Sequence, residues 1–389
     1  MKQKITSLIL ISTVLLAGLL SGCTKRAEEI IFEPEVVTPG EIATEVVAES
    51  TSEGAPVDRS FTVIDALGRS VSFEKQPEKI IIIGKATTML NNTIFLFPEA
   101  PERVISYEQR LQMDVDFITT IFEEMANKTL VDRDATAEQV APLNPDLVIL
   151  KTYMRDKVGL PIETIGIPVV YLDLESPEQF YIDLRTIGQI FGNSARAEQL
   201  VTLYKANEAR ISEALSGLSD DAKPSALMLE YKNKGGEVAF AVPPVDYLQT
   251  LIVEKAGGNP VWKEVITNGG WTVVTLEQIA AWNPDMIFLV DYNGNAAEVI
   301  SGLKQDVKWQ ALKAVINGKL YAFPVDFLSW DQPDPRWGLG ELWLASKIHP
   351  ERFPAFNMED EVVSFYTDYY GLDVTIITEI ILPLLAGDL

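Results

Sequence analysis

Few side chains in this sequence could carry out catalysis. The 389 residues include one histidine, His349, and one cysteine, Cys23. A lone histidine cannot supply a multi-histidine metal site, and a lone cysteine cannot supply a zinc site built from several thiolates. Gly84-Lys85 lacks the glycine five residues earlier that a phosphate-binding P-loop requires. We therefore expect a protein that binds a molecule without converting it, with no cofactor and no metal site of its own.

Basic and aromatic residues follow the ends of the predicted strands. In a chain of net charge −24, such a group indicates an anionic ligand, although any one of them could be an ordinary solvated loop charge. Trp271 and Trp330 lie in Gly- or Pro-containing loops, where an aromatic ring can serve as a ligand platform. The acidic charge argues against nucleic acid as a partner. The candidate ligand-binding residues are Lys85, Thr87, Tyr107, Arg110, Lys151, Tyr153 and Arg155, then Tyr231, Lys232, Trp271, Tyr292, Trp330, Asp331 and Arg336.

Apolar strands that alternate with helices position these residues. This alternation predicts an α/β fold with mostly parallel sheets flanked by helices. In such sheets the ligand crevice lies beyond the carboxyl ends of the strands. A short hairpin is predicted within residues 61–71, and a helix at residues 361–370. The predicted apolar strands are residues 79–83, 103–107, 147–150 and 168–172, then 225–229, 286–290 and 319–324.

One segment occurs twice. Residues 136–150 recur as residues 275–289, an offset of 277 − 138 = 139 residues, with the pattern Glu-Gln-x-Ala-x-x-Asn-Pro-Asp in both copies. Each copy predicts a capped short helix, a stop at Asn-Pro and an apolar strand. Generic helix-to-strand punctuation is the alternative, but the number of identities favours two similar lobes with a ligand cleft between them.

A helical span separates the two copies. Ser176 is an expected N-cap, Pro177 suits the first helical position, and Gln179 can return a hydrogen bond to the cap. The helix should pause at Gly192-Asn193, restart at Ser194 and continue to Gly217, a second stretch of roughly 36 Å. A helix of that length can join two lobes.

The N-terminus has the pattern of a secretory signal. Lys2 and Lys4 precede an apolar run at residues 5–20, which is too short for a stable membrane span. The ending Leu20-Ser21-Gly22-Cys23 resembles the bacterial lipoprotein cleavage box, which implies a lipid on Cys23; an unlipidated signal is the alternative. Residues 24–57 are rich in glutamate and predict a flexible acidic tether.

Residues 331–345 have the pattern Asp-x-Pro-x-Pro-Arg-Trp-Gly-Leu-Gly-Glu-Leu-Trp-Leu-Ala. Together with this segment, the features above resemble the helical-backbone substrate-binding lipoproteins of ABC importers. That family includes receptors for iron-siderophore, haem and cobalamin, and some relatives bind molybdate or tungstate. The resemblance runs from about Phe61 to Phe353. The loop at Gly84-Lys85-Ala86-Thr87 departs from the serine-rich version of the family, so no ligand contact is transferred there.

The resemblance implies a monomer outside the cytoplasm, anchored to the membrane by lipid, which delivers its ligand to a permease and its ATPase. It also implies only modest closure of the lobes, and it implies that Glu138 and Glu277 dock onto the permease. A carboxylate in the first turn of a helix is favoured by the helix dipole in any case.

The expected boundaries are residues 1–23 for the signal peptide, 24–57 for the tether, 58–175 for the N-terminal lobe, 176–217 for the connecting helix, 218–355 for the C-terminal lobe and 356–389 for a C-terminal helical extension.

Three functions remain open at this point. The leading one is a receptor for a metal chelate, most of all a ferric siderophore, with haem or cobalamin as further candidates. The second is a receptor for an oxyanion such as molybdate or tungstate, which suits the lysines and arginines, whereas the aromatic residues favour a larger ligand. The third, from a different class, is a surface-anchored enzyme that processes a chelate.

Overall fold

A computed structural model describes residues 59–264 and 269–389 of the chain. The predicted signal peptide, Cys23 and the whole of the predicted tether lie outside the described residues. Within the described part, no helix combines the length and the apolar character that a membrane crossing requires.

The first lobe contains a five-stranded sheet in which all neighbouring strands run parallel, in the order β5-β4-β3-β6-β7. The strands β3, β6 and β7 are buried along their whole length, as the apolar runs predicted, whereas the edge strand β5 is largely exposed. A small antiparallel hairpin precedes it, formed by β1 (Phe61–Ile64) and β2 (Ser70–Phe73). The sheet strands are β3 (Ile80–Ile82), β4 (Val104–Glu108), β5 (Thr129–Val131), β6 (Leu147–Lys151) and β7 (Val169–Leu172), and the helices are α1 (Thr87–Ile94), α2 (Ala100–Arg103), α3 (Phe117–Ile121), α4 (Ala137–Val140) and α5 (Leu160–Thr164).

The second lobe has a mixed sheet with a parallel centre. The strand order is β11-β9-β8-β12-β13, and β10 pairs with β8 off this path. β8, β12 and β13 run parallel, whereas β9 is antiparallel to both of its neighbours. The strands are β8 (Ser225–Lys234), β9 (Glu237–Val242), β10 (Asn259–Pro260), β11 (Thr272–Val274), β12 (Met286–Val290) and β13 (Leu320–Ala322), and the helices are α8 (Leu248–Lys255), α9 (Leu276–Trp282), α10 (Ala296–Gln305), α11 (Lys313–Ile316) and α12 (Trp337–Ile348).

In each lobe the repeated segment ends a short helix and fixes the start of a neighbouring strand. Asn144 and Asn283 end their short helices in the left-handed conformation, with φ of 47° and 42°. Asp146 accepts the backbone N–H of Lys79 at 3.1 Å, and Asp285 accepts that of Ser225 at 2.8 Å. Each aspartate thereby fixes the start of the neighbouring strand, β3 or β8. The two copies lie in separate sheets, which confirms the predicted repeat.

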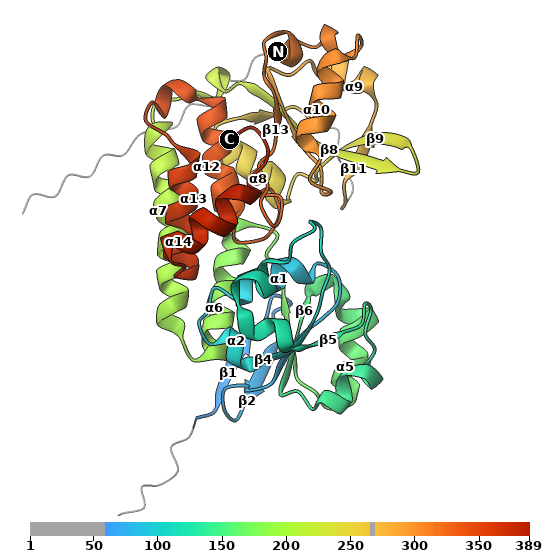
Figure 1. The fold of residues 1–389 in the computed structure, drawn as a ribbon, viewed down its shortest axis with the longest axis vertical. Coiled ribbons are helices and arrows are strands. Elements are labelled where there is room, and N and C mark those ends of the chain that lie inside the picture. Colours follow the sequence, from blue (N-terminus) through green and yellow to red (C-terminus); the bar gives the residue numbers. More distant parts are fainter. Residues whose placement is uncertain (1–58, 265–268) are drawn as a thin grey trace, which may run out of the picture. The chain divides into compact units, whose positions relative to one another are not determined.

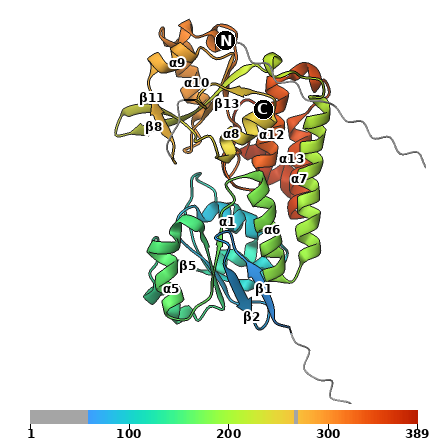
Figure 2. The same cartoon turned by 180° about the vertical axis from the view of Figure 1, so that it is seen from behind.

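Two helices connect the lobes. α6 (Pro177–Phe191) begins after Ser176, whose hydroxyl accepts the N–H of Gln179 at 3.2 Å, and it ends at Gly192 in the left-handed conformation. α7 (Ser194–Ala214) starts after Asn193, so the predicted pause and restart are confirmed. The described residues belong to one compact unit, and both views show α7 running alongside the two lobes (Figures 1 and 2).

The C-terminal extension adds α13 (Met358–Tyr370), α14 (Val374–Ile376) and further helical turns up to Leu384. The helix predicted at residues 361–370 is therefore confirmed, and it begins slightly earlier. The end of the chain returns to the second lobe, where the Asp388 carboxylate accepts the N–H of Ala322, at the end of β13, at 2.7 Å.

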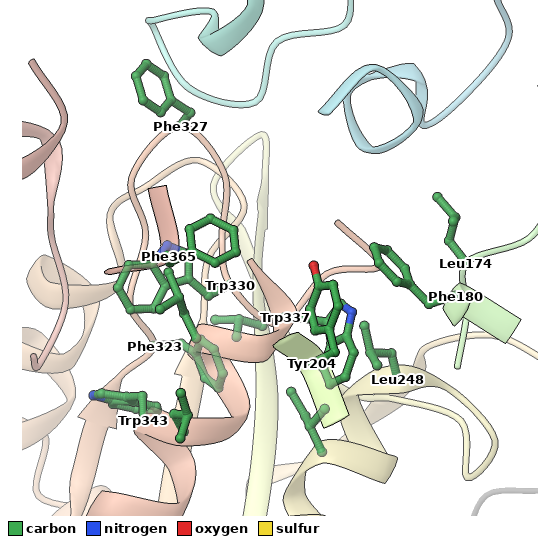
Figure 3. Close-up of a cluster of buried hydrophobic side chains, with 14 of the residues drawn as sticks. Leu174, Phe180, Tyr204, Leu248, Phe323, Phe327, Trp330, Trp337, Trp343 and Phe365 are labelled. Atoms are coloured by element: carbon green, nitrogen blue, oxygen red, sulfur yellow. The ribbon is translucent and has the colours of Figure 1, made fainter. Parts of the chain in front are cut away.

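One buried hydrophobic cluster extends through both lobes and the connecting helices. At its centre the rings of Tyr204 on α7 and Trp337 on α12 stack 4.8 Å apart, and Phe180 on α6 meets both edge-on (Figure 3). Because this aromatic contact is buried, the connecting helices and the second lobe share a single core.

Candidate functional site

A small pocket lies at the carboxyl ends of β3 and β4, where α1 begins. Its volume is about 230 Å³, and Thr88, Arg110, Gln112 and Arg133 are among its lining residues. Ala86 precedes α1 in the left-handed conformation, with φ of 59°, and its side chain does not cap the helix. Backbone N–H groups at such a helix end attract negative charge. The pocket therefore combines a helix N-terminus with two guanidinium groups.

The buried carboxylate of Glu108 holds the loops of this pocket together. It accepts the backbone N–H of Gly84 at 2.8 Å and that of Asp134 at 3.3 Å, and it pairs with Arg110. Arg110 in turn donates to the Gly84 carbonyl at 3.1 Å. Glu108 has no exposed surface. The sequence analysis missed this residue, although an acidic side chain at the end of an apolar strand was the available signal.

Two basic side chains at this end of the first lobe, Arg133 and Lys85, have no acidic partner within the described residues. Arg110 also pairs with Asp134 at 3.3 Å, so its charge is largely compensated. Arg133 and Lys85 are exposed, and neither has an ion pair within the described residues. Thr87, the first residue of α1, is fully buried, and its hydroxyl has no hydrogen-bond partner in the described part of the chain.

The pocket borders the contact between the lobes. Gln112 in its wall exchanges two side-chain hydrogen bonds with Gln332 of the second lobe, at 2.8 and 2.7 Å. Asn92 at the far end of α1 donates to the Asp334 carboxylate at 2.6 Å. A ligand held at the start of α1 would consequently lie beside the second lobe.

A second crevice of about 340 Å³ is lined by residues from both lobes. Tyr153, Asp173 and Glu175 come from the first lobe, and Asp246 and Tyr247 come from the second. Although Tyr153 is 55% exposed, desolvation of its phenol, followed by the negative charge of Glu175, raises its pKa to about 12. The phenol therefore stays protonated near neutral pH and can donate a hydrogen bond.

An aromatic pair in the second lobe consists of Trp271, just before β11, and Tyr292, just after β12. The rings of Trp271 and Tyr292 meet edge-to-face at 6.1 Å, and both residues are partly buried. The Tyr292 hydroxyl donates to the buried Asp331 carboxylate at 2.8 Å. Burial raises the pKa of Asp331. Asp331 thus fixes the orientation of Tyr292 and has no exposed surface for a ligand.

Several of the candidate ligand residues lie in the core. Arg336 pairs with Asp326 at 2.7 Å and with Asp334 at 2.9 Å, at the junction of the lobes. Lys151 pairs with Glu175 at 2.7 Å and so supports the wall of the crevice between the lobes. These side chains offer a ligand no accessible surface here, and we leave them out of the proposed ligand surface. The fully or almost fully buried candidates are Thr87, Tyr107, Lys151, Trp330, Asp331 and Arg336.

Three further candidates have local partners or another location. Arg155 pairs with Asp156 at 3.1 Å, and Lys232 pairs with Glu230 at 2.9 Å. Tyr231 lines a separate cavity of about 760 Å³ in the second lobe. The structure therefore brings together Lys85 and Arg110 in one place, Tyr153 in a second, and Trp271 with Tyr292 in a third.

Glu138 and Glu277, the two candidates for permease docking, lie at matching places in the lobes. Each is exposed and lies in the first turn of its helix, α4 or α9. Hydrogen bonds from its own backbone N–H and from the Thr275 side chain lower the pKa of Glu277. It therefore remains charged at neutral pH.

We compared the sequence and the fold with those of known proteins. The sequence pattern of the periplasmic binding protein family matches residues 108–326, which is more than half of the chain. The chain belongs to this family. Like the ABC-transporter binding proteins to which it is similar, this periplasmic binding protein is built to bind a solute.

Three relatives of this periplasmic binding protein differ in what their names say they bind. The molybdate-binding protein MolA of Haemophilus influenzae is 23% identical, over 81% of this chain and 89% of its own. The iron-uptake system-binding protein of Bacillus subtilis is 24% identical, over 68% and 80%. The ABC transporter substrate-binding lipoprotein YvrC of Bacillus subtilis, described as uncharacterized, is 24% identical, over 87% and 96%.

The similarity extends to solved structures. MolA bound to molybdate has a TM-score of 0.66 and 20% identity, and the match covers 80% of this chain and 98% of that one. At this identity the likeness concerns the fold. It confirms the predicted fold class of two α/β lobes.

Proposed function

We propose that this protein is an extracytoplasmic lipoprotein that captures an anionic solute and delivers it to the permease of an ABC importer. The observation that carries the proposal is the pocket at the start of α1. A helix end without a side-chain cap, Arg110 and Arg133 gather there, beside the second lobe, and Arg133 has no ion pair in the part of the chain that the structure describes. In a chain of net charge −24, a pocket wall with two arginines and no acidic residue favours an anion over other solutes.

A metal chelate, most of all a ferric siderophore, is the first candidate for the ligand. The Trp271 and Tyr292 rings and the exposed Tyr153 offer apolar and hydrogen-bonding surface that a bare inorganic anion would not need. The iron-uptake relative supports this candidate. Haem combines a planar ring with two carboxylates, and cobalamin has a planar corrin ring edged with amides, so both could use the same aromatic and hydrogen-bonding surface.

An oxyanion such as molybdate or tungstate is the second candidate. The pocket at α1 has a volume of about 230 Å³, which suits a small anion better than a whole chelate. Helix N-termini and arginines are common partners of tetrahedral anions. The similarity to MolA supports this candidate.

Fluorescence titration of the purified mature chain with ferric siderophores, haem, cobalamin, molybdate and tungstate separates the candidates. The Trp271 fluorescence is expected to change strongly with a chelate and weakly with a small oxyanion, because only the larger ligand extends from the pocket to the Trp271 and Tyr292 rings. Arg133→Ala should weaken binding of the true ligand about tenfold. Arg155→Ala is the matched control, since Arg155 is also partly exposed but pairs with Asp156. Unchanged affinity in Arg133→Ala would reject the proposed site, and turnover of a ligand without permease would favour an enzyme.

The anchor and the location are also part of the proposal. The lipoprotein-type ending at Cys23 supports attachment to the outer face of the cell membrane, and the lipoprotein relative YvrC agrees with it. In fractionated cells, Cys23→Ala should move the protein from the membrane to the soluble fraction. Retention of that variant in membranes would contradict a lipid anchor.

A further inference from the structure

A cavity of about 500 Å³ lies among α7, α8 and α12, on different elements from the pocket at α1. These three helices pack against one another, and both views show them side by side (Figures 1 and 2). Leu215 and Leu218 give the cavity an apolar wall, and Glu208, Lys255 and Glu341 give it charged groups.

Glu341 is the unusual member of this lining. The residue is only 1% exposed, and neither of its carboxylate oxygens has a hydrogen-bond partner within the described residues. A buried carboxylate without a partner is costly, so the carboxyl group either keeps its proton or acquires a positive partner. Burial, followed by the nearby charge of Glu208, raises the pKa of Glu341 to about 8.

The lysines around the cavity already have partners. Lys255 pairs with Glu208 at 2.9 Å and lies 3.7 Å from Glu178. Lys223 pairs with Asp220 at 2.8 Å. Glu254, a further carboxylate in the lining, pairs with Lys263.

The charge of Lys255 partly opposes the rise in the pKa of Glu341, but Lys255 is paired with Glu208, so Glu341 has no ion pair of its own within the described residues. Among residues 59–264 and 269–389, no group of three acidic, histidine or cysteine side chains could hold a metal ion. The missing positive charge is therefore better supplied by an organic cation.

We propose that this cavity binds a small primary amine. The Glu341 side chain, which lines the cavity with little exposed surface, turns toward it and pairs its carboxylate with the ammonium group, and the aliphatic part of the amine lies against Leu215 and Leu218. The cavity has more than enough room for a short aliphatic amine. This site is separate from the anion pocket and does not depend on the proposed transport function.

Calorimetric titration of the mature chain with n-butylamine tests the proposal, with no anion ligand present. Because Glu341 must lose its proton to pair with the ammonium group, affinity should rise about tenfold between pH 6 and pH 7. In buffers of different ionisation enthalpy, binding at pH 7 should release close to one proton. n-Butanol has the same aliphatic part without the charge and should not bind.

Glu341→Gln should weaken butylamine binding at least tenfold and abolish the proton release. Glu237→Gln, at an exposed position on β9, should change neither. No saturable binding of butylamine at pH 8, or binding of unchanged strength in Glu341→Gln, would overturn the proposal. If Glu341→Gln does not fold, the pH dependence and proton release of the unsubstituted protein decide alone, since a pH-independent affinity is incompatible with the site.

Discussion

The residue that organises the anion pocket is the buried Glu108, which does not itself line it. Its carboxylate joins the loops after β3, β4 and β5 through Gly84, Arg110 and Asp134. Replacing one member of a buried ion pair leaves the other uncompensated, at a cost of about 3 kcal/mol. We therefore expect Glu108→Gln to lower the free energy of unfolding by about this amount and to weaken ligand binding.

Urea unfolding and ligand titration measure both effects of Glu108→Gln. Glu78→Gln is the control, because Glu78 pairs with Lys75 on the surface, where both side chains are mostly exposed. Its free energy of unfolding should change by no more than about 0.5 kcal/mol. Equal effects of the two substitutions would show that Glu108 does not organise the loops.

The buried carboxyl group of Glu341 should make the free energy of unfolding depend on pH. Its pKa is raised to about 8 in the folded protein, whereas an unfolded glutamate titrates near about 4.3. The folded state thus binds the proton more tightly, and this group's contribution to stability falls as pH rises from about 4 to about 8. The loss is on the order of 4 kcal/mol, and Glu341→Gln should not show it. Urea unfolding at pH 5, 6.5 and 8 tests this, and parallel profiles for the two proteins would contradict it.

At the scale of elements, hydrogen bonds attach the C-terminal extension to the connecting helix α7 and to the first lobe. Arg196 on α7 donates to the carbonyl of Leu96 in the first lobe at 3.1 Å. The same guanidinium donates to the carbonyls of Asp368, at 3.3 Å, and Tyr369 on α13. Tyr370 on α13 also donates to the Asn92 carbonyl at 3.0 Å. The extension therefore belongs to the same folded unit as the first lobe.

Arg196→Ala should lower the free energy of unfolding by about 2 kcal/mol, because it removes several charged hydrogen bonds to partly buried carbonyls. Arg185→Ala is the control, since Arg185 pairs with Glu198 on the exposed face of α6 and α7. Chemical unfolding followed by circular dichroism compares the two. If Arg196→Ala costs no more than Arg185→Ala, the guanidinium is not a brace.

The elements that could be predicted were those with local signals. Asn-Pro stops and N-cap residues determine short-range geometry, so α4, α6, α7, α9 and the apolar strands were found. The hairpin of β8 and β9 was missed, although its two-residue turn Gly235-Gly236 is a known signal, with φ of 64° and 90°. Its polar residues obscured the alternation.

The site was harder to predict because exposure is a tertiary property. Arg336 and Trp330 come from a loop with prolines, which the sequence analysis treated as surface. In the structure that loop lies at the contact between the lobes, and Asp326 and Asp334, which both precede Arg336 in the sequence, neutralise it. The guanidinium also lies over the Phe117 ring of the first lobe and donates to the Tyr366 hydroxyl on α13. Such partners from distant parts of the sequence cannot be derived from local spacing.

At the scale of the whole molecule, the two lobes carry matching exposed carboxylates. Glu138 and Glu277 are exposed at equivalent positions of the repeat, so one membrane protein with two similar halves could contact both. We expect the double variant Glu138→Lys and Glu277→Lys to abolish uptake of the ligand by cells. Because neither residue lies in a ligand pocket, affinity measured by fluorescence titration should be unchanged. Lysines at Glu124 and Glu237, exposed glutamates outside the repeat with one in each lobe, provide a control of equal charge and should leave uptake intact. Normal uptake in the first double variant would remove the docking assignment, whereas loss of uptake in both variants would point to net charge and not to position.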